Sequence, residues 1–488
     1  MYFGAGRAGR ARTLAALPVV PALFLTLSLA GRPAAATPID DPFVGGMSFS
    51  GPTSGDLGAV YWNPAALGLM RGFQVMVAGT ARWSSIGVSL ASQPQATARN
   101  LRQPFQWPPG PGAYVAVGYG SDRITLAVAT YMPYLEQIHF PTSPGGNEPT
   151  RYQMLSMDLR NLALVPALAI RIGNELRVGL APGVMFSTGS LSFAEDTALD
   201  GGLAGAGNPN ADARYNVDSG QGLGDAKVSL TLGGGLYFRH RNVEMGLSYQ
   251  SRPLATGVSG VEIAGDQSTV TLPPRLGGGP LTCAGQSARC VFGDVTYHLP
   301  DVVIGGVTWH LGPGLQLDVM ARWLWTHLQD RIDIRLIGPT LESAGLPEHI
   351  VLYRGFHDAL DARARIAYWW RERLRVAAEL RIETSAVDAN AVNAAAVDGL
   401  QIEPVVLAEL RVSRRFWLGA GYGLTIMPSV TVTNSIFDPN AATACVAASG
   451  DLNNAGCQAR QNGTARPSAN GTYTSLAQDF GLTFNAKF

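Results

Sequence analysis

The end of the chain alternates strictly between apolar and polar positions. From Phe480 to Phe488 an apolar side chain occupies every second position, and Asp479, Thr483 and Lys487 lie on positions between them. A repeat of two residues predicts a strand with one apolar face and one polar face. We therefore expect the chain to end on a half-buried strand.

The same alternation recurs along the chain in segments of about ten residues, the length of a strand that crosses a membrane. Tight turns at 120–123, 173–175, 240–242, 311–314, 371–373 and 413–415 join these segments in pairs. With an opening strand at 73–83 and a closing strand at 473–488, the pattern predicts fourteen strands. The remaining connections are long and rich in Gly, Pro, Asn, Asp and Ser, and are expected to be exposed loops. They cover 84–112, 133–158, 188–225, 252–299, 327–357, 384–402 and 428–472.

Charged side chains also follow the strand period. In 374–383, Arg375, Glu379 and Arg381 alternate with apolar residues. A lipid-facing arginine costs about 2–4 kcal/mol at mid-membrane, so these charges are expected to face the lumen. Mixed-sign rows in a lumen form either a substrate path or a paired structural network, and the pattern favours the network.

Composition supports a membrane barrel. Hydrophobic residues make up 46% of the chain and charged residues only 15%, against about a quarter in soluble domains. Beyond the amino terminus no apolar run of about eighteen residues could form a membrane helix. An exported chain of this kind can bury its apolar surface in lipid only as a closed barrel. A secreted sandwich or propeller is the alternative, but no blade-length repeat supports a propeller.

The amino terminus predicts export. Three arginines precede an apolar run at 14–30, and three alanines follow at 34–36, which is the pattern of a secretory signal peptide over residues 1–36. A membrane anchor is the alternative, but two prolines interrupt this short run. Without the segment the chain carries 32 basic and 36 acidic residues, which gives no reason to expect nucleic-acid binding.

Four cysteines lie in two of the long connections. An even count in an exported chain favours disulfides, and proximity favours Cys283 with Cys290 and Cys445 with Cys457 among three possible connectivities. Metal binding is disfavoured because neither pair has CxxC spacing or a histidine partner. We expect no metal and no cofactor.

The segment before the first strand carries the most specific motif. The run Tyr61-Trp-Asn-Pro-Ala-Ala-Leu-Gly68 lies directly ahead of that strand, and here the chain resembles the FadL/TodX family of outer-membrane transporters. The resemblance implies a Gram-negative outer-membrane barrel at 73–488, a monomer surrounded by membrane lipid. It also implies that a hatch at 37–72, containing Asn63, Pro64 and Ala65, fills the lumen.

In this family the ligand leaves through a sideways opening at a kinked third strand. Pro133 follows residues 127–132 in the third predicted strand, and proline cannot donate to a sheet ladder. Pro133 therefore either opens the wall or simply ends the strand at the outer rim, and the sequence leaves both readings open. The resemblance identifies no ligand-contacting residue.

The expected function is passive uptake of a hydrophobic small molecule, with long-chain fatty acids ranked first. An aromatic-hydrocarbon channel of the same family is the alternative, and a general aqueous porin or an adhesive barrel is a weaker one. We expect no enzyme and no catalytic residue. No Gly-x-Ser-x-Gly or His-Glu-x-x-His motif occurs, and the seven histidines are scattered among turns and loops.

Overall fold

The computed structural model describes residues 49–90, 96–102, 113–143, 146–197, 209–220, 225–254, 261–264, 268–281, 292–338, 348–437 and 469–488, with Met47, Leu341 and Leu346. All of them belong to one compact unit, Pro33–Phe488. The predicted signal peptide at 1–36 and the four cysteines lie outside the described residues. Within the described residues no helix is both long and apolar enough to span a membrane.

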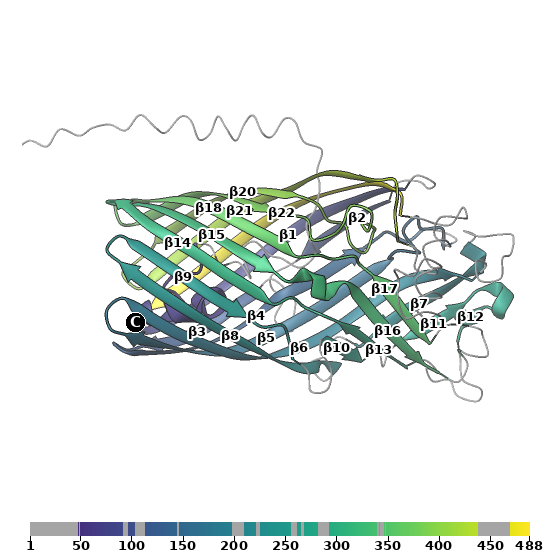
Figure 1. Cartoon of the computed structure of the whole chain (residues 1–488), viewed down its shortest axis with the longest axis horizontal. Helices are drawn as coiled ribbons and strands as arrows, with labels where there is room; N and C mark the ends of the chain where they lie inside the picture. The colour runs from purple at the N-terminus through teal and green to yellow at the C-terminus, as the bar shows by residue number, and fades with distance from the viewer. Residues whose placement is uncertain are drawn as a thin grey trace, which may run out of the picture. The chain divides into compact units, whose positions relative to one another are not determined.

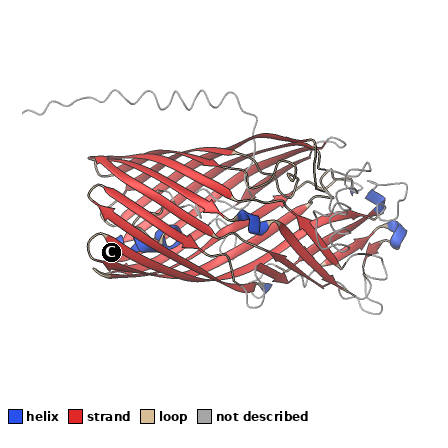
Figure 2. Ribbon diagram, viewed as in Figure 1, coloured by secondary structure: helices blue, strands red, loops and turns tan. Residues whose placement is uncertain are grey.

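The unit is a closed antiparallel barrel of fourteen strands, as predicted (Figures 1 and 2). The last strand pairs with the first from Gln74↔Lys487 to Leu90↔Gly471, which closes the ring. In order around the barrel the strands are β1 (Gly72–Leu90), β3 (Ala113–Gly120), β4 (Ile124–His139), β5 (Ser156–Ile172), β6 (Leu176–Asp196), β8 (Lys227–His240), β9 (Val243–Gln250), β14 (Val302–Gly312), β15 (Leu315–Leu324), β18 (Ala359–Trp370), β19 (Leu374–Glu383), β20 (Gln401–Arg411), β21 (Phe416–Val432) and β22 (Gly471–Lys487).

The charged strand positions face the lumen, as expected. Leu360 is exposed on the outer surface, whereas the neighbouring Asp361 is fully buried. The Asp361 carboxylate accepts from Arg322 at 2.6 Å and from Arg381 at 2.9 Å, and Arg381 also lies 3.2 Å from Glu403. These side chains form a paired network on β15, β18, β19 and β20.

The long connections contain more regular structure than the sequence suggested. β1, β4 and β6 extend well into the predicted loops. Further short strands are β2 (Ala96–Arg102), β7 (Asp212–Asp218), β11 (Thr269–Leu272) and β12 (Gly279–Pro280). A separate four-stranded sheet consists of β10 (Val261–Ala264), β13 (Phe292–Tyr297), β16 (Arg331–Ile337) and β17 (His349–Tyr353). Short helical turns are η3 (Pro209–Ala211), η5 (Pro274–Leu276) and η6 (Thr326–Gln329). In β16 the buried Ile332, Ile334 and Leu336 show the two-residue period that the surrounding Gly and Pro residues obscured.

The predicted exposed loop at 384–402 is instead largely buried. We call residues 385–399 the inner loop. Every residue from 391 to 399 is buried, although none lies in a helix or a strand. Buried backbone groups need partners, and here Asp398 accepts from the N–H groups of Ala386 and Gly399, while Gln153 accepts from Ala394 N–H at 2.7 Å. The prediction was wrong because these distant partners allow an Ala- and Val-rich loop to pack inward.

The Asp398 carboxyl is the electrostatic feature of the inner loop. Burial raises its pKa to about 7, although the N–H of Ala386 opposes the rise, and the Glu383 carboxylate adds to it. This pKa lies above the usual aspartate value of about 3.9. The contribution of this carboxyl to loop stability is therefore fully present below the usual aspartate pKa. The contribution declines as the pH rises through 7.

We expect Asp398→Ala to loosen the inner loop and remove the pH dependence of its protection. The substitution leaves two buried N–H groups without an acceptor, at about 1–3 kcal/mol each. Hydrogen–deuterium exchange at pH 5 and pH 8, corrected for intrinsic rates, should show faster exchange in 385–399, with no change in protection between the two pH values. Asp388→Ala is the matched control, because this carboxylate lies in the same loop and is 71% exposed. Equal protection in both variants would contradict the assignment.

Candidate functional site

Residues 49–71 form a buried N-terminal segment inside the ring of strands (Figure 2). It contains the short helix α2 (Ala59–Trp62) and the 3₁₀ turn η1 (Pro64–Leu69), which packs mainly against β5, β6 and β8. Inward-facing side chains of the wall bind its backbone. Ser248 donates to Trp62 O at 2.6 Å, and Tyr114 donates to Leu57 O at 2.7 Å.

Asn63 joins this segment to the barrel wall. Its side chain is fully buried, and its amide donates to Pro52 O at 2.8 Å and to Leu236 O on β8 at 2.9 Å. Its carbonyl accepts from Ala65 N–H at 3.1 Å and so caps η1, while Pro64 occupies the first turn, where a missing N–H costs nothing. These three hydrogen bonds satisfy both the donor end and the acceptor end of the Asn63 side chain.

Glycines in the wall provide the space in which Asn63 sits. A Cβ on Gly235 of β8 would collide with the Asn63 carbonyl oxygen, and one on Gly246 of β9 would collide with Pro52 O. A Cβ on Gly179 of β6 would collide with the backbone of Pro64 and Ala65. The close backbone approach therefore requires residues without a side chain at these positions.

On another side, arginines of the wall hold the aromatic side chains of the segment. The guanidinium of Arg363 lies 5.0 Å from the Trp62 ring centroid, and that of Arg375 lies 4.4 Å from the Phe49 ring. Cation–π contacts of this kind are worth about 0.5–2 kcal/mol, more when they are shielded from water. Arg365 also donates to Ser50 O at 3.3 Å. The segment is thus held to β8 and β9 and to β18 and β19.

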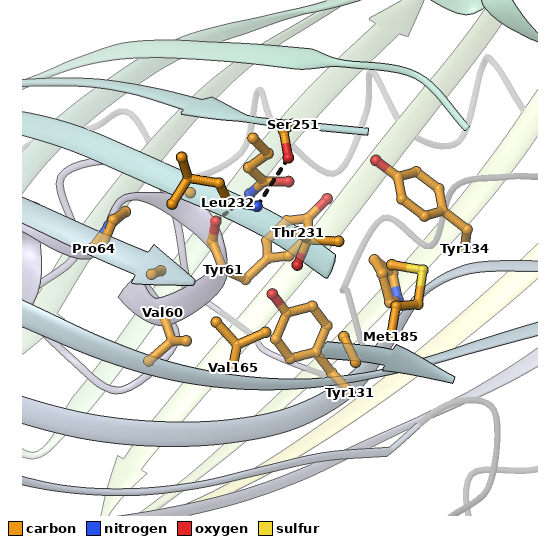
Figure 3. Close-up of a pocket in the computed structure, with 15 residues that line it drawn as sticks. Val60, Tyr61, Pro64, Tyr131, Tyr134, Val165, Met185, Thr231, Leu232 and Ser251 are labelled. Atoms are coloured by element: carbon orange, nitrogen blue, oxygen red, sulfur yellow. Dashed lines mark hydrogen bonds between the residues drawn. The ribbon is translucent and has the colours of Figure 1, made fainter. Parts of the chain in front are cut away.

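A cavity of about 40 Å³ lies between the segment and the wall (Figure 3). Tyr61, Tyr131 and Tyr134 lie around it, and Tyr61 meets Tyr131 edge to face at 5.5 Å. Pro133 is part of its lining, which brings this predicted residue and Pro64 to one place. None of the fifteen lining residues is charged. The cavity therefore suits an uncharged group.

The wall beside the cavity has irregular strand pairing. β4 does not end at Pro133 but continues to His139, so the reading of Pro133 as a strand end is wrong. Its register with β5 shifts between Tyr131 and Tyr134, and its pairing with β3 ends at Tyr131.

A second irregularity lies between β5 and β6, where sequence reasoning saw none. The pairing is missing between Leu164↔Val184 and Leu168↔Leu180, a distance of four residues or about 14 Å. In this register Pro166 and Pro182 lie opposite each other. Both strands stay paired on their other sides, so the missing N–H groups are those that would bond β5 to β6. We call residues 165–167 and 181–183 the β5–β6 gap.

The β5–β6 gap borders the cavity, because Val165 and Ala181 belong to both. β20 and β21 show a comparable interruption at Pro404, between Ile402↔Ile426 and Val405↔Gly423. There, however, the buried Glu403 faces the lumen. Of these two gaps, the one with apolar surroundings on the lumen side is the one between β5 and β6. Two prolines in central strands were the available signal.

The chain matches a family model described as outer membrane protein transport protein (OMPP1/FadL/TodX) over residues 33–399. No curated protein matches it. Among solved structures, a FadL homologue of Pseudomonas aeruginosa is 11% identical with a TM-score of 0.65, covering 93% of this chain and 99% of that one. The toluene transporter TodX of P. putida is 12% identical with a TM-score of 0.61, covering 94% and 99%. The Ralstonia pickettii toluene transporter TbuX is 12% identical with a TM-score of 0.57, covering 90% and 98%. At sequence identities this low, the structural similarity establishes the fold alone.

We expect Gly235→Ala to displace the N-terminal segment without breaking the barrel. The new methyl group would collide with the Asn63 carbonyl oxygen and break the Asn63–Leu236 hydrogen bond. Hydrogen–deuterium exchange across residues 59–70 should accelerate, by the equivalent of about 1–3 kcal/mol for the lost buried contacts.

Gly234→Ala is the matched control, because a Cβ there meets only Leu180 Cδ2 at 3.8 Å and a backbone oxygen at 4.0 Å. Heat-modifiable gel mobility should show a folded barrel in both variants. If residues 59–70 exchange as slowly in Gly235→Ala as in Gly234→Ala, the docking described above is incorrect.

Proposed function

The chain belongs to the outer membrane protein transport family (OMPP1/FadL/TodX), and from this premise we propose that it admits small, uncharged hydrophobic molecules by passive diffusion. Its place is the outer membrane of a Gram-negative bacterium, and its family consists of transport proteins. The observation that carries the proposal is the uncharged cavity between the N-terminal segment and the irregular wall of β4, β5 and β6.

In this proposal residues 37–72 act as a hatch that closes the lumen. The described part is held by Asn63 on one side and by arginines on the other. An aqueous porin requires no such buried segment. A hydrophobic solute also gains little from an aqueous channel, because each methylene is worth about 0.8 kcal/mol out of water. A closed lumen with an uncharged cavity suits such a solute better.

The exit is proposed to lead sideways through the wall beside Pro133. The register shift of β4 and the β5–β6 gap both lie at this cavity. The inward residues Val165 and Ala181 are apolar, so a solute passing from the cavity into the bilayer would meet no charged side chain. The outward step would then be driven by the preference of an apolar solute for lipid.

The lining bears on the choice of ligand. A fatty-acid carboxylate buried without a cation would carry a penalty of several kcal/mol. We therefore propose compact aromatic hydrocarbons, the alternative from the sequence analysis, ahead of long-chain fatty acids, because they carry no charge. Two of the similar structures are named toluene transporters.

Size gives a further condition. The cavity of about 40 Å³ is well below the roughly 150 Å³ of an apolar cavity that holds benzene. The rings of Tyr61 and Tyr131 must therefore move when a ligand enters. We propose that the protein acts as a monomer, with outer-membrane lipid as its surroundings.

Uptake of labelled toluene and oleate tests the proposal in a Gram-negative host that lacks its own transporter of this family. Cells producing the protein should take up toluene severalfold faster than vector controls, with little gain for oleate. Pro166→Val with Pro182→Val should reduce toluene uptake, because two new N–H donors complete the β5–β6 ladder. Pro404→Val is the control, since it adds a donor at a gap beside the charged Glu403.

Folding of each variant is checked by heat-modifiable gel mobility. Faster uptake of oleate than of toluene would reject the ligand class. Undiminished toluene uptake in the double variant would reject the exit at the β5–β6 gap. Uptake of small hydrophilic solutes at a rate comparable with that of toluene would show that the protein is a general porin.

A further inference from the structure

An apolar groove lies on the outer, lipid-facing wall of the barrel, away from the lumen cavity. It has a volume of about 540 Å³, within the roughly 300–1,000 Å³ of small-molecule clefts. Its lining comes from β1, β19, β20, β21 and β22, the strands around the seam where the barrel closes. Thr483 is the one polar residue among the lining residues, and its side chain is buried on the lumen side.

The groove follows from the sizes of the outward side chains in successive rows of the sheet. Bulky residues form one cross-strand row near the short turns: Leu374, Leu410, Leu418, Phe484 and Val77. In the next row toward the middle of the membrane Ala408, Ala420 and Gly79 are small, whereas Leu482 stands between Ala420 and Gly79. The small residues leave depressions behind the bulky first row, on both sides of Leu482.

The short turns below this groove are rich in arginine. The β18–β19 and β20–β21 turns carry four exposed arginines against one acid, Glu372. These arginines are Arg371, Arg373, Arg414 and Arg415. The other short turns carry fewer arginines: 121–123 contains Asp122 and Arg123, 173–175 carries Glu175, 240–242 carries the single arginine Arg241, and 311–314 has no charge. The terminal carboxylate of Phe488 lies at the same edge. Together with Glu372 it offsets only two of the four arginines, and the local charge is therefore positive.

The arginines and the groove adjoin. Arg373 immediately precedes Leu374, and the first row of the groove lies about two residues, or roughly 7 Å, from the turns. On the other side, Arg415 lies 5.9 Å from the Phe488 ring, which contacts Phe416, and Phe416 stacks on Phe484 of the groove at 5.8 Å. A cationic rim therefore continues directly into an apolar groove.

We propose that this face binds one anionic phospholipid of the periplasmic leaflet, with its phosphate among the turn arginines and an acyl chain in the groove. The short turns of such barrels lie on the periplasmic side, at the level of that leaflet's headgroups. Basic side chains near a membrane surface attract anionic lipid. A bound lipid would also cover the closing seam between β22 and β1. This inference is independent of the ligand route.

A second copy of the chain fits this face less well. Two barrels in one membrane have the same orientation, so a symmetric contact at the groove would bring the two arginine rims together. Like charges at an interface disfavour association. An anionic lipid instead neutralises the rim.

Native mass spectrometry of the delipidated full-length protein, titrated with dioleoyl-phosphatidylglycerol or dioleoyl-phosphatidylcholine, tests the proposal. The two lipids share their acyl chains and differ in net charge. The wild type should bind the anionic lipid roughly tenfold more tightly. Arg373→Glu with Arg414→Glu should abolish this preference, and Ala420→Phe should weaken binding of both lipids by filling the groove.

Matched controls use the same substitutions elsewhere. Arg241→Glu changes an exposed arginine on the β8–β9 turn, four or more strands around the ring from those that line the groove, and Ala321→Phe enlarges an exposed alanine of β15. Neither should alter the preference. Equal binding of the two lipids by the wild type, or an unchanged preference in the double variant, would overturn the proposal. A dimer that Ala420→Phe disrupts would show that a second copy occupies the groove, and would overturn it as well.

Discussion

Hydrocarbon offers no hydrogen-bond partner, so each backbone N–H and C=O of the membrane wall has to be satisfied within the protein. Closure of β22 on β1 satisfies the two edges of the sheet at once. Under the same constraint, a proline in this wall removes a hydrogen-bond donor that nothing in the hydrocarbon replaces. Pro166 and Pro182 lie opposite each other and remove both donors of one pair, which leaves a weak place in the ladder between β5 and β6. We expect the wall to open more easily there than where the ladder is complete.

The N-terminal segment and the wall depend on each other in a similar way. Asn63 can donate to Leu236 O only because Gly235 leaves the space that a side chain would fill. Conversely, these wall glycines would leave voids in the lumen if the segment were not there. The arginines that contact Trp62 and Phe49 belong to, or lie beside, the buried network around Asp361. The rigid lumen network thus helps to hold the segment in place.

The sequence predicted the features that depend on local period and local turns. The alternating segment 374–383 is the strand Leu374–Glu383, because alternation and the 371–373 turn both mark it. The inner loop could not be predicted, since an Ala-rich loop has the composition of an exposed one until Gln153, far away in the chain, reaches Ala394 N–H. The pairing of Pro166 with Pro182 was accessible in principle. The two residues lie equally far from Asn174, at the centre of the β5–β6 turn, but their opposition emerges only when the register is worked out.

The claim that the lumen is closed, so that solutes leave through the wall, is tested most directly by ion conductance. Single barrels in planar lipid bilayers would be recorded for the wild type and for a variant lacking residues 49–68. The account predicts little steady conductance for the wild type and a large, ohmic conductance for the deletion variant, provided that its barrel stays heat-modifiable. A wild type that conducts ions as freely as the deletion variant would contradict it.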